Sequence, residues 1–451
     1  MSKNPLIKRI PLMFRHIMYN LRGGFLIRPL LIALGLGGAG AILSCLEEEF
    51  PRVSTWVPSI IFPTHSDPQV AQVILAGIAA SIMTVVSIVF AILLMTLTLA
   101  SMQFSPRIIV SFSRDRVTQW TLGIFLGTFS YCMAALPAAR SLPRPFAPVV
   151  TVLGAMTLAL VCVGLLLFFI HHISQAISVN HIVDRIADET EAMIDEVMPA
   201  PRRLERLHHD ERLSPNPNEM AVLSEKSGYI RFIDTRRLVT VAKFYHVKVR
   251  VLRRVGHFVP SGVPVMMVAK GDRLSTEGTS ELLAAFDFGP TRTLQQDVEF
   301  GVLQIVDIAL KAISPAVNDP STAITCIDQL SRILIRFASR ERPEKLLYDP
   351  PGVVRASIGW VQFERLLDAA FDQIRMYSKA DVAVSLRLLR ALSDIAVATP
   401  DTEFRRLLVD RGIRVVTGCS EKLSKDELKA LCVRQVALES LTTPPQPPID
   451  Q

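Results

Sequence analysis

Four long stretches with almost no charged side chains set the pattern of the first 172 residues. A helix needs about 20 mostly apolar residues to cross the hydrocarbon core of a bilayer. Each stretch is long enough, so we predict a transmembrane domain over residues 25–172, preceded by a basic segment, residues 1–24. The predicted spans are residues 25–46, 70–104, 117–139 and 145–172.

The second stretch differs from the others in its length and in its hydroxyl groups. Residues 70–104 contain no charged side chain, and hydroxyls recur close to one helical face. A helix that meets only lipid gains little from such a face, so the face meets either another helix or water. Helix packing and the lining of an ion path are both compatible with the pattern. The candidate pore-lining residues are Ser81, Thr84, Ser87, Ala91, Thr98 and Ser101.

Beyond residue 172 the chain becomes polar, and its pattern becomes that of mixed helices and strands. An apolar stripe at intervals near 3.6 residues predicts that the last spanning helix continues past the membrane. Prolines and polar residues then end this helix and form a linker. Residues 173–220 are therefore the predicted helical extension and linker.

A small β domain is predicted over residues 221–292. The segments 228–233 and 247–251 alternate between apolar and polar side chains, as half-buried strands do. Closely spaced turn residues follow, and the pattern resembles the flattened barrels of biotinyl and lipoyl carrier domains. Those domains carry a modified lysine between two methionines, which this segment lacks. We therefore expect a structural barrel or sandwich.

A helical domain is predicted over residues 293–441, and the proline-rich tail, residues 442–451, is expected to be disordered. Thr293 with Gln296 predicts a capping box that opens the first helix. Asp319, which precedes a proline, predicts the start of the next one. The further amphipathic segments are residues 354–377, 380–398, 402–417 and 425–441.

The expected fold class is thus an α-helical membrane protein with four transmembrane helices and a cytoplasmic α+β region. The formal net charge of +7 reflects basic residues beside the spans. Ten Lys and Arg residues flank one side of the spans and three flank the other, which predicts that both termini are cytoplasmic. Basic residues there would contact anionic lipid heads of the bilayer. Because no Arg/Lys stripe alternates with aromatic residues in the polar part, no nucleic acid partner is expected.

Charged side chains gather where the predicted spans meet the cytoplasm. The acids Asp184, Asp188 and Glu189 would concentrate cations if they lined a vestibule, or they form a solvated helix face. Basic residues at the same membrane face attract anions, so the pattern leaves ion selectivity undecided. These basic residues are Arg107, Arg114 and Arg116.

A second candidate site is a dense group of polar residues in the first two helices of the helical domain. Asp297 and Asp307 fall near one helical face, so a ligand or cation site is one interpretation. Capping and turn formation are the other, because Asn318 and Asp319 precede a predicted helix. The members are Asp297, Glu299, Gln304, Asp307, Asn318 and Asp319.

Sequence signatures of catalysis are absent. The six cysteines are scattered without a CxxC pair, and no HExxH, nucleophile-elbow or phosphate-loop sequence occurs. We therefore expect reduced structural thiols, no metal site, no cofactor and no enzymatic activity.

Several segments spread over most of the chain form one combined signature. They are residues 104–107 (Phe-Ser-Pro-Arg), 114–116 (Arg-Asp-Arg) with Gln119 and Gly127, 169–173 (Phe-Ile-His-His-Ile), and 296–301 (Gln-Asp-Val-Glu-Phe-Gly) with 314–323. With these segments the chain resembles a family of bacterial predicted membrane proteins, domain of unknown function 2254. The resemblance implies a bacterial inner-membrane protein with this layout and brings no established activity.

The leading functional hypothesis is a homo-oligomeric channel, or channel-like transport protein, of the bacterial inner membrane that passes inorganic ions. Residues 70–104 would line the path, and the cytoplasmic region would assemble and gate it. The alternative is a membrane-anchored signalling or scaffold protein whose cytoplasmic domain binds a partner. That alternative predicts hydroxyls buried between helices of one subunit. A membrane enzyme with a pocket around Asp297, Gln304 and Asp307 is the least favoured hypothesis.

Overall fold

The computed structural model divides into two compact units, Met1–Ser178 and Val179–Gln451, which we call the four-helix unit and the α+β unit. The candidates Arg107 and Arg114 lie outside the described residues, as do the Ser101 side chain and the two predicted terminal segments. The described residues are 27–50, 67–103, 116–140, 145–176, 178–198, 218–341, 343–349 and 352–441.

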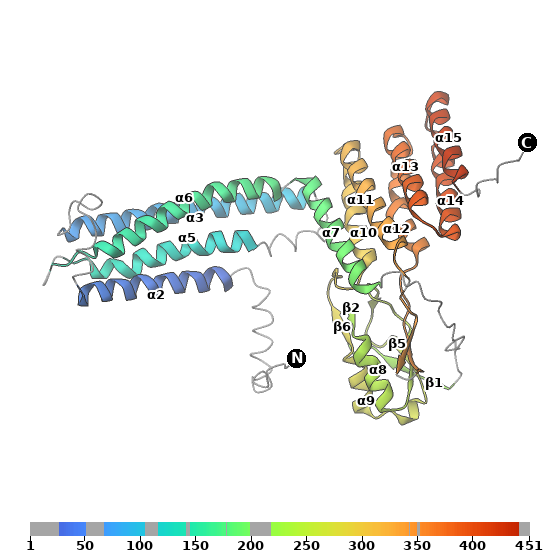
Figure 1. Ribbon diagram of the computed structural model, residues 1–451, viewed down its shortest axis with the longest axis horizontal. Coiled ribbons are helices and arrows are strands. Elements are labelled where there is room, and N and C mark those ends of the chain that lie inside the picture. Colours follow the sequence, from blue (N-terminus) through green and yellow to red (C-terminus); the bar gives the residue numbers. More distant parts are fainter. Residues whose placement is uncertain are drawn as a thin grey trace, which may run out of the picture. The chain divides into compact units, whose positions relative to one another are not determined.

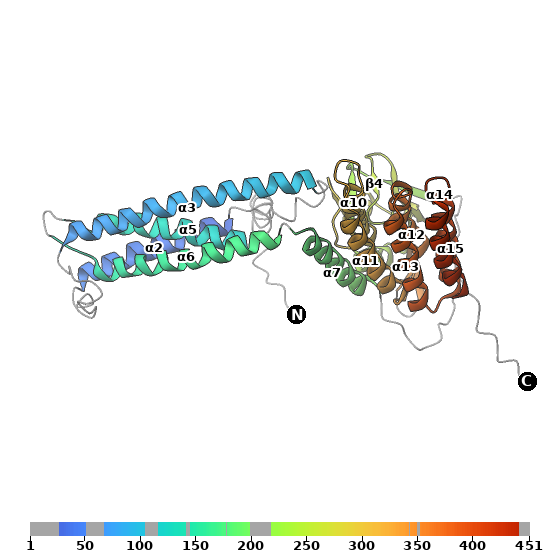
Figure 2. The same cartoon turned by 90° about the horizontal axis from the view of Figure 1, so that it is seen from above.

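Four helices that are long and apolar enough to cross a membrane form the described part of the first unit, which confirms the predicted spans. Figure 1 and Figure 2 show them lying side by side. Their bounds differ from the predicted ones by only a few residues. They are α2 (Ile27–Glu49), α3 (Pro68–Gln103), α5 (Arg116–Ala135, followed by a 3₁₀ turn, Leu136–Ala138) and α6 (Val149–Ala176).

Glycines let α2 and α5 approach each other closely. A Cβ atom at Gly40 would lie 2.7 Å from the backbone oxygen of Tyr131, and one at Gly123 would lie 2.7 Å from Ile32 Cδ1. Small residues at such contacts are typical of helix packing in membranes, where dispersion contacts replace the hydrophobic effect. The glycine-rich pattern of α2 is thus explained in part by packing against α5.

One face of α3 packs against α5 and α6. Leu75 and Val89 on this face are fully buried. The part of this face from Ile82 to Val89 packs in one cluster with Phe125 of α5 and Phe169 of α6. This packing fixes the rotation of α3 about its axis, so the opposite face points away from the other three helices.

The α+β unit begins with α7 (Val179–Val197), which does not continue α6. Helix α6 ends at Ala176, and Ser178 between the two helices is not helical. The predicted single extension of the last span is therefore wrong, and the boundary between the two units coincides with this break.

Two sheets form the β part, with α8 (Thr235–Phe244) and α9 (Thr276–Leu283) packed against them. The larger sheet has the order β1-β5-β3-β8-β7, antiparallel except for the parallel pair β3–β8, and the smaller has the order β4-β2-β6. The strands are β1 (Glu219–Leu223), β2 (Gly228–Ile233), β3 (Lys248–Val251), β4 (Phe258–Val259), β5 (Pro264–Ala269), β6 (Phe286–Gly289), β7 (Leu346–Asp349) and β8 (Val353–Ser357).

The strands predicted at 228–233 and 247–251 are confirmed by β2 and β3. The predicted helix over residues 354–377 is wrong in its first part, where β8 pairs with β3 through Val249 and Ala356. The β part therefore uses strands from beyond residue 292. The sheets share one core that includes Ile230, Val249 and Val268.

Six further helices stack in two layers beside the β part (Figure 1). Stacked phenylalanines connect three of them, with ring centroids 6.4 Å apart between Phe337 and Phe363 and 4.1 Å apart between Phe363 and Phe404. The helices are α10 (Val298–Ala312), α11 (Pro320–Ala338), α12 (Phe363–Tyr377), α13 (Val382–Ala398), α14 (Thr402–Cys419) and α15 (Lys425–Ser440).

The cap predicted for α11 is confirmed, because the Asp319 side chain accepts from the backbone N–H of Thr322. The capping box predicted at Thr293 and Gln296 is wrong. The cap of α10 is Asp297, which accepts from the backbone N–H of Phe300. Gln296 instead exchanges hydrogen bonds with the backbone of Ile233, at 3.0 and 3.3 Å.

Candidate functional site

The candidate pore-lining residues of α3 with described side chains lie on the face that the rest of the subunit leaves uncovered, whereas Thr96 of the same helix is buried. Ser81, Thr84, Ser87 and Thr98 are all exposed in the single chain, and so is Ala91 between them. The prediction that these hydroxyls are buried between helices of one subunit, which belonged to the scaffold hypothesis, is therefore wrong. These hydroxyls must therefore face lipid, another subunit or water.

Three of these hydroxyls donate to backbone carbonyls one turn earlier in α3. The bonds are Thr84 Oγ1 to Ala80 O (3.1 Å), Ser87 Oγ to Met83 O (3.0 Å) and Thr98 Oγ1 to Leu94 O (2.9 Å). Such bonds satisfy the hydroxyl proton within the helix. Each oxygen keeps acceptor capacity on the outward side. The exposed face of α3 therefore presents acceptor oxygens along an otherwise apolar helix.

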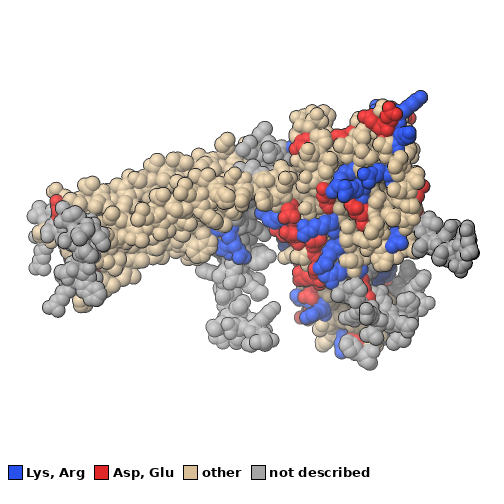
Figure 3. All heavy atoms as spheres, turned by 45° about the horizontal axis from the view of Figure 1, so that its top comes forward, with Lys and Arg blue, Asp and Glu red and all other residues tan. Residues whose placement is uncertain are grey.

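The four helices carry almost no charge between their ends, as Figure 3 shows for one face. Of the basic residues assigned to the cytoplasmic mouth, Arg116 lies exposed at the first position of α5. The acidic residues of that group belong to α7.

The acidic face of α7 pairs with a row of arginines on α11 and just after its end. Arg332 lies 3.1 Å from Asp184, 2.5 Å from Asp188 and 2.6 Å from Glu191. The next turn repeats the arrangement, because Asp195 contacts both Arg336 and Arg340. Much of the acidic pattern that suggested a cation vestibule therefore faces guanidinium groups.

These ion pairs lower the pKa of Asp195 and raise the pKa of Arg332. Hydrogen bonds from Arg336 hold the pKa of Asp195 below its usual range, and those from Arg340 add to the effect. Hydrogen bonds to Glu191 and Asp188 raise the pKa of Arg332. Glu189 lies on another part of the helix surface, 3.9 Å from Arg185.

Asp297 and Glu299 are buried carboxylates that pair with several arginines. Arg292 binds Asp297 through Nε at 2.7 Å and through Nη2 at 2.9 Å, and its guanidinium lies 5.6 Å from the centre of the Phe300 ring. Glu299 contacts Arg254, Arg292 and Arg365 at 3.0 to 3.3 Å. Both carboxylates are less than 10% exposed.

The other members of the candidate group do not converge with this network. Asp319 caps α11 and bonds the Thr322 hydroxyl at 2.6 Å, and these bonds lower the pKa of Asp319. Asn318 has a positive φ of 49°, as a turn residue before a cap often does. Gln304 is buried with its Oε1 lacking a partner among the described residues, and Asp307 is half-buried. Capping and turn formation thus account for Asn318 and Asp319.

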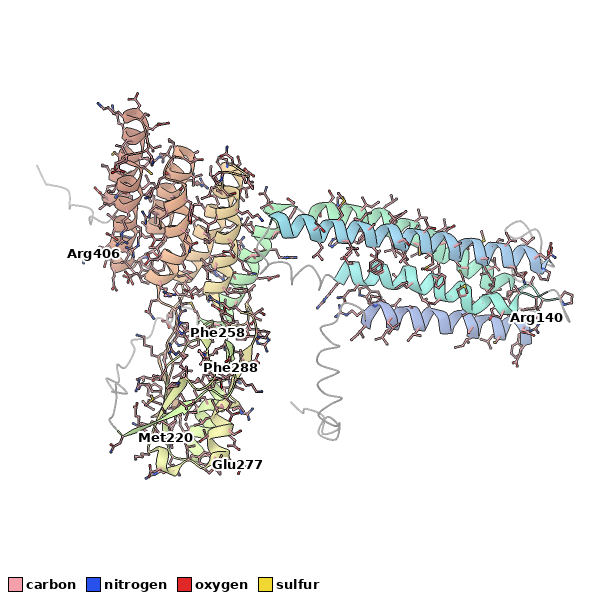
Figure 4. The ribbon with its side chains drawn as sticks, turned by 180° about the vertical axis from the view of Figure 1, so that it is seen from behind. Arg140, Met220, Phe258, Glu277, Phe288 and Arg406 are labelled. Atoms are coloured by element: carbon pink, nitrogen blue, oxygen red, sulfur yellow. The ribbon has the colours of Figure 1, made fainter. Side chains whose placement is uncertain are left out.

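Glu47 is a structural residue that the sequence pattern did not reveal. Its buried carboxylate accepts from the backbone N–H groups of Val150 and Thr151, at 2.8 and 3.0 Å, and from the Thr151 hydroxyl at 2.9 Å. These are the free donors at the start of α6. The neighbouring Glu48 pairs with Arg140, labelled in Figure 4. The end of α2 therefore caps α6, through partners about a hundred residues away in sequence.

Comparison with known proteins agrees with this architecture. A family model described as "Predicted membrane protein (DUF2254)" matches residues 22–394. The uncharacterized proteins Rv1290c of Mycobacterium tuberculosis and Mb1321c of Mycobacterium bovis are each 31% identical over 402 residues, which cover 88% of this chain and 76% of each relative. No solved structure matches. The chain therefore belongs to the DUF2254 family of predicted membrane proteins.

Proposed function

We propose that the chain forms a homo-oligomeric, channel-like transport protein of the bacterial inner membrane. The hydroxyl face of α3 lines a path for inorganic ions, and the α+β unit lies in the cytoplasm and serves assembly and gating. The main support is the exposed face of α3. This helix is long and apolar enough to span a membrane, yet the face that it exposes in the single subunit carries acceptor oxygens.

The length of α3 agrees with such a role. Its 36 residues extend for about 54 Å at roughly 1.5 Å per residue. The hydrocarbon core of a bilayer is only about 30 Å thick. A helix that crosses the bilayer and projects beyond it can form both the wall of a path and the wall of its entrance.

The outward faces of α3 and α6 differ in a way that favours different neighbours. Helix α6 exposes large apolar side chains, such as Leu160 (74% exposed) and Leu167 (67% exposed), which suit lipid. Helix α3 also exposes large apolar side chains, but Ser81, Ser87 and Ala91 are exposed among them. Small and hydroxyl residues favour contact between helices, and copies of α3 around an axis would provide such contact together with a polar lining.

Conduction by the purified protein in planar lipid bilayers tests the proposal. We expect unitary currents, and we expect Ser87→Leu to reduce them at least severalfold, because it replaces an acceptor oxygen by a bulky apolar group. Thr157→Leu is the matched control, because the Thr157 hydroxyl is exposed on α6 and makes the same bond to a carbonyl one turn earlier. Protein that never conducts, or equal currents from both variants and the parent, would contradict the proposal.

Labelling by a water-soluble thiol reagent tests the lining independently of conduction. In a background with the exposed Cys45 and Cys432 changed to serine, we expect cysteines at positions 84 and 87 to react in membranes. A cysteine at position 160 of α6 should stay unlabelled, because lipid covers that position in the proposed assembly. Protection of positions 84 and 87 would favour a dry contact and the scaffold alternative.

The alternative function, a membrane-anchored signalling or scaffold protein, has one observation in its favour. Helix α15 at the end of the helical stack exposes Val433 (64%) and Val436 (63%) on one face. Exposed apolar residues at the end of a stack of helices are sites where a further element can pack. On this alternative the protein never conducts, so the bilayer experiment separates the two functions.

A further inference from the structure

Three arginine side chains from separate parts of the α+β unit meet at one carboxylate, that of Glu299 in the first turn of α10. The distances to its oxygens are 3.0 Å from Arg254 Nη2, 3.3 Å from Arg292 Nη2 and 3.0 Å from Arg365 Nε. The Glu299 side chain is only 7% exposed. One carboxylate thus lies among three positive charges that it cannot neutralise alone.

Positive charge exceeds negative charge around Glu299. Asp297 supplies a second carboxylate, which binds Arg292. Three guanidinium groups therefore act here against two carboxylates, which favours a further anion.

A groove of about 560 Å³ lies beside this cluster, between α10 and α12. Its volume is in the range of small-molecule sites. Arg292, Arg365 and Glu299 line one part of it. The Arg365 side chain is 65% exposed, and its bond to Glu299 uses Nε, so its two terminal nitrogens stay outside that bond. Guanidinium groups with free N–H donors bind the oxygens of a phosphate in pairs.

The rest of the groove has a different character. Gln362, Gln373, Glu364 and Asp368 line it. Both acids already bind Arg411, at 3.4 and 2.6 Å. A second anionic group would be unfavourable there, whereas hydroxyl, amide or amino groups could bond the amides and carboxylates. The ligand class that fits is one phosphate joined to an uncharged or cationic polar group.

We propose that this groove binds a phosphate monoester, with the phosphate at Arg365 and Arg292 and its polar remainder along α12. Glu299 serves as an internal counter-ion that keeps the arginines in place when the groove is empty. Removing its charge would increase the positive excess at the phosphate position. Affinity for phosphate should therefore rise when Glu299 is neutralised and fall when Arg365 is neutralised.

Isothermal titration calorimetry on the full chain in detergent tests this site, with inorganic phosphate, adenosine monophosphate and short-chain dihexanoyl phosphatidate as probes. We expect saturable binding of at least one phosphate ester, tighter than that of inorganic phosphate. The ester that binds more tightly identifies a soluble or a lipid source. Arg365→Gln should weaken binding about tenfold or more, because a charge-assisted hydrogen bond contributes that much affinity.

Two further variants sharpen the test. Arg390→Gln is the matched control, because Arg390 is a comparably exposed arginine (58%) whose ion-pair partner among the described residues, Asp394 on the same helix α13, is 3.9 Å away. It should bind like the parent, while Glu299→Gln should bind phosphate severalfold more tightly. Absence of binding to all three probes, or equal affinity of Arg365→Gln and the parent, would overturn the proposal. Because no step involves conduction, these results are independent of the channel experiments.

Discussion

Glu47 shows how a single carboxylate can join two membrane helices. It is 2% exposed and accepts three hydrogen bonds at the start of α6. We expect Glu47→Ala to lower the free energy of unfolding by about 2 kcal/mol, because it leaves capping donors of α6 without an acceptor. Thermal unfolding of the purified protein in one detergent measures the change.

The adjacent residue provides the control for this prediction. Glu48 pairs with Arg140, and both side chains are about 40% exposed, so Glu48→Ala should cost less than about 1 kcal/mol. Equal destabilisation by the two variants would show that the loss comes from the end of α2 in general and not from the cap.

Glu299 makes the stability of the α+β unit depend on pH. Burial raises the pKa of Glu299, but Arg254, Arg365 and Arg292 outweigh burial and hold the pKa below its usual range. The ionised group therefore stabilises the fold above its ordinary pKa of about 4.3, and this stabilisation is lost as the pH falls through the lowered folded value.

The matching measurement is the unfolding temperature as a function of pH. We expect the parent to lose stability steadily as the pH falls from about 5 towards 3. Glu299→Gln should be less stable at neutral pH, since it leaves the arginines without a counter-charge, and should lose less on acidification. Parallel curves for the two proteins would mean that Glu299 does not contribute to the acid transition.

Sequence reasoning succeeded at residues whose partners are close in the chain. Asp319 could be predicted as a cap because its acceptor role involves Thr322, three residues later. Glu47 could not, because its partners Val150 and Thr151 are brought to it only by the packing of α2 against α6. The same holds for Glu299, whose arginine partners come from the β part and from α12.

Helices α7 and α11 are joined by an apolar contact, and a row of ion pairs lies along the edge of that contact. Ile186 and Ile194 of α7 are buried, while Arg332 is bound by three acids at the edge of the contact. We expect Arg332→Ala to lower the free energy of unfolding by about 1 kcal/mol, since partly exposed pairs contribute little individually and more as a network. In about 1 M salt the difference from the parent should nearly vanish, because screening weakens exposed pairs.

Denaturant unfolding at low and high salt measures this effect. Arg390→Ala removes an arginine whose ion-pair partner within the described ranges is 3.9 Å away, and it should be close to neutral at both salt concentrations. If Arg332→Ala lowers the free energy of unfolding by the same amount in high salt, the Arg332 side chain stabilises the fold by packing and not by its charge.

Helices were predicted more reliably than strands because their periodicity is local. The four spans and the segments that became α13, α14 and α15 follow directly from apolar spacing. Strand β8 was missed because its place is fixed by pairing with β3, more than a hundred residues earlier. The break between α6 and α7 was missed because the apolar stripe runs through it without an interruption in the sequence.

At the scale of the whole molecule, the division into an apolar helical unit and a polar α+β unit was predictable, because it follows from hydropathy alone. Hydropathy could not predict the rotation of α3 about its own axis. That rotation depends on Val89 packing with Phe125 and Phe169, and it decides that the hydroxyls face outward. The proposed assembly therefore rests on a packing feature that only the three-dimensional structure provides.

The assembly can be tested through Ala91, which lies on the uncovered face of α3 between Ser87 and Thr98. If copies of α3 surround an axis, Ala91→Trp places a large ring where helices approach closely, and we expect the oligomeric fraction in detergent to fall severalfold. Because Ala91 is exposed in the single subunit, the fold of that subunit should not change. Leu160→Trp on α6, at a position that is 74% exposed, should leave the oligomer intact. Light scattering after size-exclusion chromatography measures both, and an oligomer that tolerates tryptophan at position 91 would place α3 away from the subunit contacts.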